Sequence, residues 1–209
     1  MPTDFELLDR WREGDSAAGN ELFRRHFRGM YRFFCEKVGS EADELIQATF
    51  MACAKARDQF RKDSSFRTYL YAVARRELYQ HFRRRTRNAK MDFAVTSMAD
   101  LGTSPSSHLA RGERKALLAQ ALRQLPLQQQ IIIELHYWED MRAPQLAAIF
   151  EIAEPTARVW LHRARQALRE RMAGLTAAPG GDPRGDPALE DWAREIRLQR
   201  RATHDREDT

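Results

Sequence analysis

Two clusters of basic side chains are the residues whose type and spacing indicate a chemical role. The first cluster follows a more acidic N-terminal stretch and contains Arg61, Lys62, Arg67, Arg75, Arg76, Arg83, Arg84, Arg85, Arg87 and Lys90. The second contains Arg158, Arg163, Arg165, Arg169 and Arg171. The net charge of +5 is too modest to identify a partner, but clustered cations are typical of polyanion-binding proteins. Two separate clusters indicate one polyanion that is contacted at two places.

The second cluster lies within a helix-turn-helix pattern. Residues 144–150 form a short helix, residues 151–153 a tight connection, and Glu154 begins a longer helix with one apolar face. In such a unit the second helix lies in the major groove, where its first turns reach bases and later cations reach phosphates. The base-facing candidates are Thr156, Arg158, Val159, His162 and Arg163, and the phosphate candidates are Arg165 and Arg169. The alternative is an ordinary helical hairpin with a solvated arginine face.

Helical periodicity dominates the elements that must position both clusters, and no strand pattern competes with it. The predicted helix caps before residue 86 are Thr3 with Glu6, Asp15, Ser40 with Asp43, and Ser64 or Ser65. In the second predicted helix, apolar residues recur at the spacing of a helix packed on others: Phe23, Phe27, Met30, Tyr31, Phe34 and Val38.

Residues 87–112 lose this periodicity and include a stretch rich in Gly, Ser, Thr and Pro, which is typical of a flexible linker. A second set of helices begins at residue 113. Within this set, Pro126 suits the first turn of the second helix. The sequence therefore predicts an all-α protein of two small helical domains, 1–86 and 113–175, joined by a flexible linker. A C-terminal extension, 176–209, is expected to be partly disordered or marginally helical.

Catalytic and metal-binding constellations are not found in the sequence. There is no Gly-rich phosphate loop and no nucleophile elbow, and the histidines are scattered. Cys35 and Cys53 stand in apolar helical patterns without ligand spacing, which favours packed, reduced thiols. The N-terminus has no secretory signal, and no apolar run is long enough for a membrane span. We therefore expect a cytoplasmic protein that is not an enzyme and has no cofactor, no metal site and no membrane insertion.

Several motifs together resemble the extracytoplasmic-function (group IV) sigma factors of bacterial RNA polymerase. The C-terminal match is Leu146–Phe150, followed by Thr156–Arg158 and Leu161–Arg165. The N-terminal match comprises Gly14–Asp15, Leu22–Phe23, Phe27, Ala42–Phe50, Phe60–Arg61, Ser64–Tyr71, Ala74–Arg75 and Arg83–Arg85. The motifs keep the order of the family across nearly all of residues 4–172, so the sequence is identified as a member of it.

The resemblance implies a role for each part of the chain. Residues 1–86 would form a sigma region 2-like domain that docks on core polymerase and recognises and melts the minus-10 element, and residues 113–175 a sigma region 4-like domain that reads the minus-35 element. The implied polymerase-binding residues are Asp43, Glu44, Gln47 and Phe50. The implied minus-10 residues are Arg61, Lys62, Ser64, Ser65, Arg67, Tyr69, Arg75, Arg76, Tyr79, Arg83 and Arg84. The implied minus-35 residues are Thr156, Arg158, Val159, His162, Arg163 and Arg165.

The partners that the resemblance implies are core RNA polymerase, through its β′ clamp helices and β flap, promoter DNA, and an anti-sigma factor. The protein would associate with the nucleoid during initiation. A stand-alone helix-turn-helix repressor or activator is the alternative; it accounts for residues 113–172 but leaves the N-terminal motifs unexplained. A helical recombinase or nuclease would need a reactive constellation, which the sequence lacks.

Some positions depart from the family pattern or have two interpretations. The departures are Arg76, Gln80, Arg142, Glu151, Val159 and Trp160. Glu151 replaces a turn glycine and would cost about 1 kcal/mol in a left-handed conformation. Trp160 either packs inward or contacts DNA. Phe66 and Tyr69 offer surfaces for bases, but their helical spacing is more typical of a core.

Overall fold

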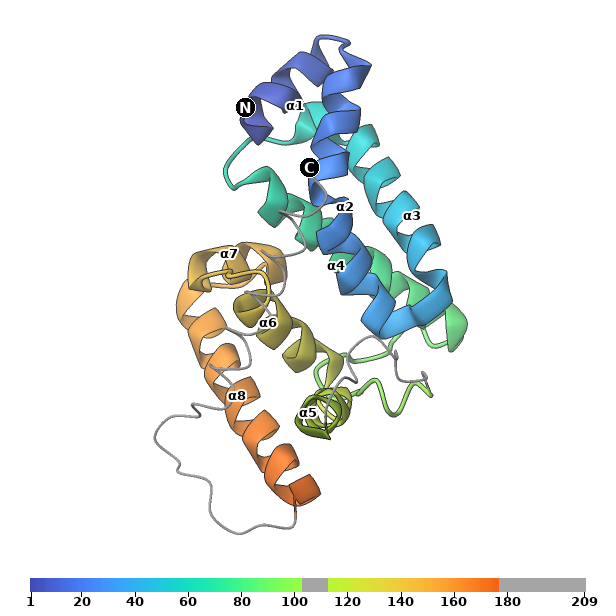
Figure 1. Cartoon of the computed structure of the whole chain (residues 1–209), viewed down its shortest axis with the longest axis vertical. Coiled ribbons are helices and arrows are strands. Elements are labelled where there is room, and N and C mark those ends of the chain that lie inside the picture. Colours follow the sequence, from blue (N-terminus) through green and yellow to red (C-terminus); the bar gives the residue numbers. More distant parts are fainter. Residues whose placement is uncertain (103–112, 177–209) are drawn as a thin grey trace.

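The computed structural model describes residues 1–102 and 113–176, and every regular element among them is helical (Figure 1). The predicted all-α architecture is confirmed, with one set of helices before residue 86 and a second after residue 112. Within the described ranges, no helix has the length and apolar character needed to cross a membrane. The predicted extension lies outside the described residues from 177 onward.

The N-terminal helices form a bundle in which α2, α3 and α4 lie side by side and α1 packs on the start of α2 (Figure 1). Its elements are α1 (Asp4–Arg12), α2 (Ser16–Val38), α3 (Ala42–Lys55) and α4 (Phe66–Arg85), with 3-10 turns at Gly39–Glu41 and Arg57–Gln59. This bundle positions the first basic cluster, since α4 carries most of its arginines.

Side-chain caps set where most of these helices begin. Thr3, Asp15 and Ser65 each accept a hydrogen bond from a backbone N–H in the first turn of their helix, as predicted. Such caps satisfy donors that have no partner within the helix. The predicted cap at Ser40 is wrong. Gly39, with φ of 59°, ends α2 and opens a 3-10 turn that contains Ser40, so α3 begins two residues later without a side-chain cap.

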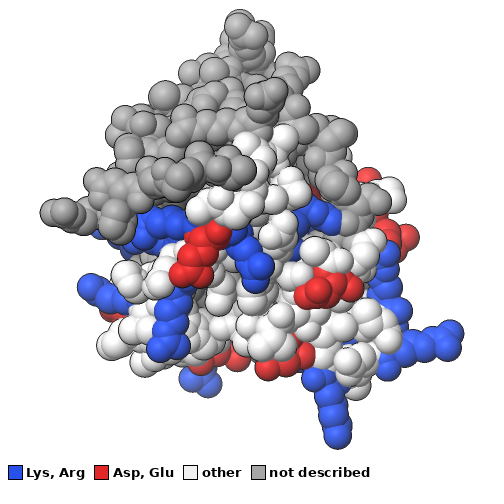
Figure 2. Space-filling view, turned by 90° about the horizontal axis from the view of Figure 1, so that it is seen from below, with Lys and Arg blue, Asp and Glu red and all other residues white. Residues whose placement is uncertain are grey.

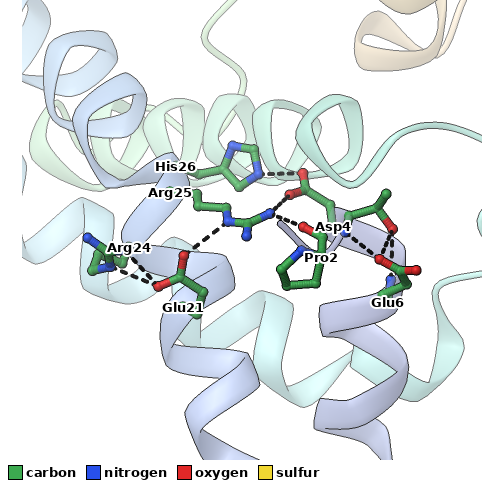
Figure 3. A network of polar contacts seen from close by, with 8 residues as sticks. Pro2, Asp4, Glu6, Glu21, Arg24, Arg25 and His26 are labelled. Atoms are coloured by element: carbon green, nitrogen blue, oxygen red, sulfur yellow. Dashed lines mark hydrogen bonds and ion pairs between the residues drawn. The ribbon is translucent and has the colours of Figure 1, made fainter. Parts of the chain in front are cut away.

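An ion network fastens α1 to α2 (Figure 3). The Asp4 carboxylate lies 2.7 Å from His26 Nε2 and 3.5 Å from Arg25 Nη1. Arg25 also donates to the backbone oxygen of Pro2 at 2.6 Å and to Glu21 at 3.1 Å. The hydrogen bond with His26, followed by the charges of His26 and Arg25, lowers the pKa of Asp4 against the opposing effect of burial. The network therefore holds α1 in place by contacts between charged groups.

The apolar residues of α2 fall into a buried group and an exposed group. Met30, Phe34 and Val38 are buried in the bundle, as predicted. Phe27 and Tyr31 are 44% and 40% exposed, so the expectation that they pack on other helices is wrong. The apolar arc of α2 is wider than the surface that its neighbours cover, and the two rings stack on each other at 6.4 Å between centroids. A residual apolar surface of this kind is available to a partner.

Both cysteines are buried free thiols, which confirms the expectation for Cys35 and Cys53. Burial, with a smaller contribution from the charge of Glu77, raises the pKa of Cys53 to about 12. Because the thiolate is the reactive form, this thiol is inert at neutral pH. Among the described residues no group of His, Cys, Asp and Glu side chains could hold a metal ion.

The C-terminal helices form a second, smaller bundle (Figure 1). They are α5 (Glu113–Arg123), α6 (Leu127–Tyr137), α7 (Ala143–Phe150) and α8 (Glu154–Thr176). The three consecutive isoleucines of α6 are all buried, and α8 packs on α5, α6 and α7. Pro126 immediately precedes α6, close to its predicted place in the first turn. This bundle positions the second basic cluster on α8.

Part of the chain between the two bundles is packed. Phe93 and Met98 are buried, and the ring of Phe93 stacks on Tyr79 of α4 at 4.1 Å. Ser97 forms an isolated antiparallel bridge with Pro126, next to α6. The absence of periodicity in this segment gave no sign of either contact. The rest of the predicted linker, residues 103–112, lies outside the described residues.

The two bundles contact each other along α4 and α7 (Figure 1). The most enclosed contact joins Lys37 of α2 to Glu134 of α6 in an ion pair whose side chains are 0% and 3% exposed. Lys37 Nζ also donates to the backbone oxygen of Phe33, and Gln130 donates to Glu134 at 2.7 Å. This buried pair of charges and its hydrogen bonds thus link the two bundles.

Candidate nucleic-acid interface

The helix-turn-helix geometry is present as predicted. The turn between α7 and α8 includes Glu151 in the left-handed conformation, with φ of 59° and ψ of 43°. Glu151 therefore adopts the left-handed conformation that was expected to be strained, because the family has a glycine at this position of the turn. At the start of α7 the backbone N–H of Arg142 donates to Gln145 Oε1 at 2.9 Å, so Gln145 supplies half of a capping box although Arg142 has no side-chain acceptor.

The predicted base-facing residues share one surface of α8. Arg158, Val159, His162 and Arg163 are exposed, and Thr156 is half-buried. Residues three and four positions apart lie on the same face of a helix, so these side chains form a continuous strip near the start of α8. Val159 adds an apolar surface, since it is 46% exposed. Apolar groups of this size suit the methyl group of thymine.

Two other residues of α8 pack against the bundle. Arg165 Nη2 lies 2.7 Å from His136 Nε2, and its guanidinium sits 5.2 Å from the centre of the Tyr137 ring. Arg165 thus braces α8 on α6, a role that the sequence gave no sign of. Trp160 packs inward, since its ring meets Phe150 edge-on at 5.9 Å.

The arginines predicted to contact the minus-10 element differ in how exposed their side chains are. Arg61, Arg76, Arg83 and Arg84 are exposed, whereas Arg67 and Arg75 are half-buried. Seen from below, the described surface shows basic side chains projecting at its edge with acidic side chains between them (Figure 2). Basic and acidic side chains thus share this face, so the charge of the face as a whole does not show which cations are available to a polyanion.

The loop before α4 is held by α1. Lys62, whose φ of 61° is left-handed, places Nζ 2.6 Å from both carboxylate oxygens of Asp9. The Arg12 guanidinium donates to the backbone oxygens of Arg57 and Phe60 at 2.6 Å. The loop thus has a defined shape, although Lys62 already has an acidic partner.

The serines and aromatic residues near the first cluster differ in their surroundings. Ser65 caps α4 and Ser64 is half-buried. The half-buried ring of Tyr69 stacks on Phe60 at 4.6 Å. Tyr79 is stacked by Phe93, and burial raises its pKa to about 12. Phe66 is buried in the core, in line with the helical-spacing interpretation.

The second bundle covers part of the α4 surface. Arg67 Nη2 donates to Glu139 Oε2 at 2.7 Å. Arg76 donates to the Glu151 carboxylate at 2.5 Å through Nη2, and this hydrogen bond is the main cause of the lowered pKa of Glu151. Carboxylates of one bundle therefore occupy arginines of the other.

Three of the predicted polymerase-binding residues, Asp43, Gln47 and Phe50, line an apolar groove on α2 and α3. Asp43, Glu44 and Gln47 are exposed, and Phe50 stacks on Phe23 at 4.4 Å. The groove, of about 610 Å³, is lined by Phe23, Phe27, Asp43, Ile46, Gln47, Phe50, Met51 and Ala54. Met51, 50% exposed, and Phe27 were missed as surface residues, because their periodicity gives no information on which apolar positions stay uncovered.

Comparison with known proteins identifies both bundles. Residues 22–88 match the family described as Sigma-70 region 2, and residues 115–168 match Sigma-70, region 4. The chain is 29% identical over 171 residues to the ECF RNA polymerase sigma factor SigF of Caulobacter vibrioides, covering 79% of this chain and 92% of that protein. It is 25% identical over 183 residues to the ECF RNA polymerase sigma-E factor of Salmonella typhimurium, covering 83% and 96%.

The fold is also similar to that of a solved structure. The sigma factor RpoE in complex with the anti-sigma factor NepR from Bartonella quintana superimposes with a TM-score of 0.57 at 22% identity, covering 73% of this chain and 95% of that chain. At this identity the likeness supports the fold alone.

Proposed function

This chain belongs to the extracytoplasmic-function sigma factors, which act in transcription initiation, and from this premise we propose how its two bundles divide the work. Residues 113–175 read the minus-35 element of a promoter as duplex DNA. Residues 1–86 dock on core RNA polymerase and capture the melted minus-10 strand. Residues 87–112 connect the two domains on the enzyme.

The observation that carries this proposal is the exposed strip on α8 directly after the turn at Glu151. Arg158, His162 and Arg163 project from a helix whose other face is packed on its own domain. An α-helix fits the major groove, and a guanidinium offers two donors to the acceptor edge of guanine. Arg165, held on α6, is then better suited to a backbone phosphate than to a base.

The surface around α4 suits a single strand in a different way. Arg61, Arg83 and Arg84 are exposed and would follow phosphates, and the half-buried Tyr69 ring offers a platform for a base. The loop 58–65, held by α1, is the proposed pocket for a base turned out of the stack. The further predicted contacts of this surface are Lys62, Ser64, Ser65, Arg67, Arg75, Arg76 and Tyr79.

The apolar groove on α2 and α3 is the proposed contact with the β′ clamp helices. Its wall combines the exposed ring of Phe27 and the half-buried rings of Phe23 and Phe50 with the acidic Asp43, which Glu44 follows in the chain. Apolar centres with charged rims are typical of protein interfaces. The second domain would contact the β flap. We further propose an anti-sigma factor as a regulator, action in the cytoplasm at the nucleoid, and no catalytic step of its own.

Transcription in vitro with purified core polymerase and a library of genomic templates tests the proposal. We expect RNA to start at defined sites that share two upstream elements, only when the protein is added. A stand-alone repressor or activator would instead bind duplex DNA specifically without polymerase. Failure to associate with core polymerase, or starts that do not depend on the protein, would contradict the proposal.

A further inference from the structure

Glu139, just after α6, inserts its side chain into the N-terminal bundle. The carboxylate is 13% exposed and lies 2.7 Å from Arg67 Nη2 and 3.6 Å from Arg32 Nη2. Arg67 also donates to the backbone oxygen of Glu139 at 2.5 Å. Two guanidinium groups from two different helices, α2 and α4, thus converge on one carboxylate of the other domain.

A buried hydroxyl completes the surroundings of this carboxylate. Tyr71 is fully enclosed, and its pKa is raised well above the ordinary value, first by burial and then by the charge of Glu139. A Cβ built on Gly29 would lie 2.8 Å from Tyr71 Oη and 3.8 Å from Glu139 Oε2. Gly29 therefore leaves the room in which the hydroxyl and the carboxylate meet. We call Arg32, Arg67 and Tyr71 the arginine nest.

The arginine nest has the composition of a phosphate site. Guanidinium groups pair with phosphate as they do with carboxylate, and a hydroxyl adds a neutral donor. Arg67 was predicted to contact DNA, whereas Arg32 was not. In the closed molecule described here, the anion in the nest is a side chain of the protein itself.

The other ion pairs between the domains have the same polarity. Lys37 pairs with Glu134, and Arg75 and Arg76 face Glu151 at 3.7 and 2.5 Å. In each of these pairs the cation belongs to the N-terminal bundle and the carboxylate to the C-terminal bundle. The C-terminal domain thus presents an acidic surface to cations that a nucleic acid would otherwise attract.

We propose that Glu139 occupies the place of a DNA backbone phosphate in the arginine nest, so that the chain closes on itself and must open before the nest can bind DNA. This inference rests on the proposed function, because it takes the α4 surface to be DNA-binding. It adds a phosphate site that includes Arg32 and Tyr71, and a competition between Glu139 and DNA for that site.

The energetics of the interface suit a contact that opens. A buried ion pair gains little net free energy, because the attraction offsets the cost of removing both charges from water. Lys37 and Glu134 recover their hydration when the domains part. DNA that binds the open form more tightly than the closed form then shifts the equilibrium toward the open form. The size of this shift is set by the ratio of the two affinities.

The test measures the affinity for a short single-stranded DNA of mixed sequence and the radius of gyration, both on the full chain. We expect Glu139→Gln to tighten DNA binding roughly 5-fold or more and to enlarge the radius of gyration. Glu13→Gln is the matched control, because Glu13 is exposed and its loss changes the net charge equally; we expect it to change neither quantity. Unchanged affinity for Glu139→Gln, with or without expansion, would overturn the proposal.

A second set of variants tests the nest itself. In the Glu139→Gln background, Arg32→Gln is expected to abolish the gain in affinity, whereas Arg24→Gln, which removes an exposed arginine of the same helix, is expected to retain most of it. Equal losses for the two arginine variants would overturn the phosphate site.

The unaltered chain provides a test that does not depend on the folding of a variant. Saturating single-stranded DNA is expected to enlarge its radius of gyration, and a DNA-bound chain that stays compact would overturn the competition. If the unaltered chain directs core polymerase to defined start sites while these measurements fail, only the present inference is wrong. If it does not, the proposed function fails, together with the inference that rests on it.

Discussion

The two candidate DNA-binding surfaces use the same residue type under opposite conditions. On α8 the arginines of the predicted strip are exposed, and Arg158 pairs with Glu154 one turn earlier in the same helix. On α4, Arg67 and Arg76 are bonded to carboxylates of the other domain. An arginine-rich sequence therefore identifies both surfaces, but only the tertiary contacts distinguish the open one from the covered one. In the proposed function, the exposed strip on α8 can meet duplex DNA directly, whereas the α4 surface has to be uncovered first.

The largest effect is expected from breaking the buried pair between the domains. Lys37→Met leaves the carboxylate of Glu134 enclosed without its cation, a change that costs about 3–5 kcal/mol in buried pairs. Separation of the domains relieves this cost and exposes the α4 surface. We therefore expect a larger radius of gyration, measured by small-angle scattering. The double variant with Glu134→Gln removes the unpaired charge and is expected to be compact again. A compact Lys37→Met chain of unchanged stability would refute the role of this pair.

The open surface is tested by Arg163→Ala. If Arg163 contacts a base, its loss costs about 1–3 kcal/mol of promoter affinity at one upstream base position. The measurement compares binding of the polymerase complex to promoters substituted one base pair at a time. Equal loss on every promoter variant would remove Arg163 from direct readout.

A smaller and less selective effect is expected from Arg84→Ala. This exposed arginine at the end of α4 would contact phosphate, so its loss weakens binding nearly independently of sequence and reduces the salt dependence by about one released counterion. The observable is the slope of log affinity against log salt concentration. A sequence-selective loss would show that Arg84 contacts a base.

The smallest expected effect is a weakening of the covered surface in acid. The hydrogen bond from Arg76 lowers the pKa of Glu151 below its ordinary 4.5, so the contact is fully present above that value and is lost as the pH falls through the lowered pKa. We expect single-stranded DNA affinity to rise modestly as the pH approaches this range from above. Glu151→Gln is expected to lack that increment, and an identical pH dependence in both chains would exclude Glu151 as its cause.

Local features of the sequence predicted much of the fold. Thr3, Asp15 and Ser65 act on the helix that each begins, so their role depends on neighbours within three residues. The turn at Glu151 is local in the same sense. The exposure of Phe27 was not predictable, because it depends on how much of α2 the other helices cover.

Contacts between distant residues could not be read from the sequence. Lys37 and Glu134 are separated by 97 positions, and nothing in either local pattern indicates a buried charge. The contact of Arg165 with His136, 29 positions earlier, is equally absent from the local pattern of either residue. The candidate arginines were thus found by their type, and their availability was decided by the packing of the two domains.

The distance between α4 and α8, the two helices proposed to bind DNA, tests the account most directly. Labels on cysteines introduced at the exposed Gln80 of α4 and Gln166 of α8 would report it, since the native cysteines are buried. We predict one short, narrow distance distribution in the free chain and a longer one in the complex with core polymerase and promoter DNA. The same short distance in both states would contradict the claim that the α4 surface must be uncovered before it binds DNA.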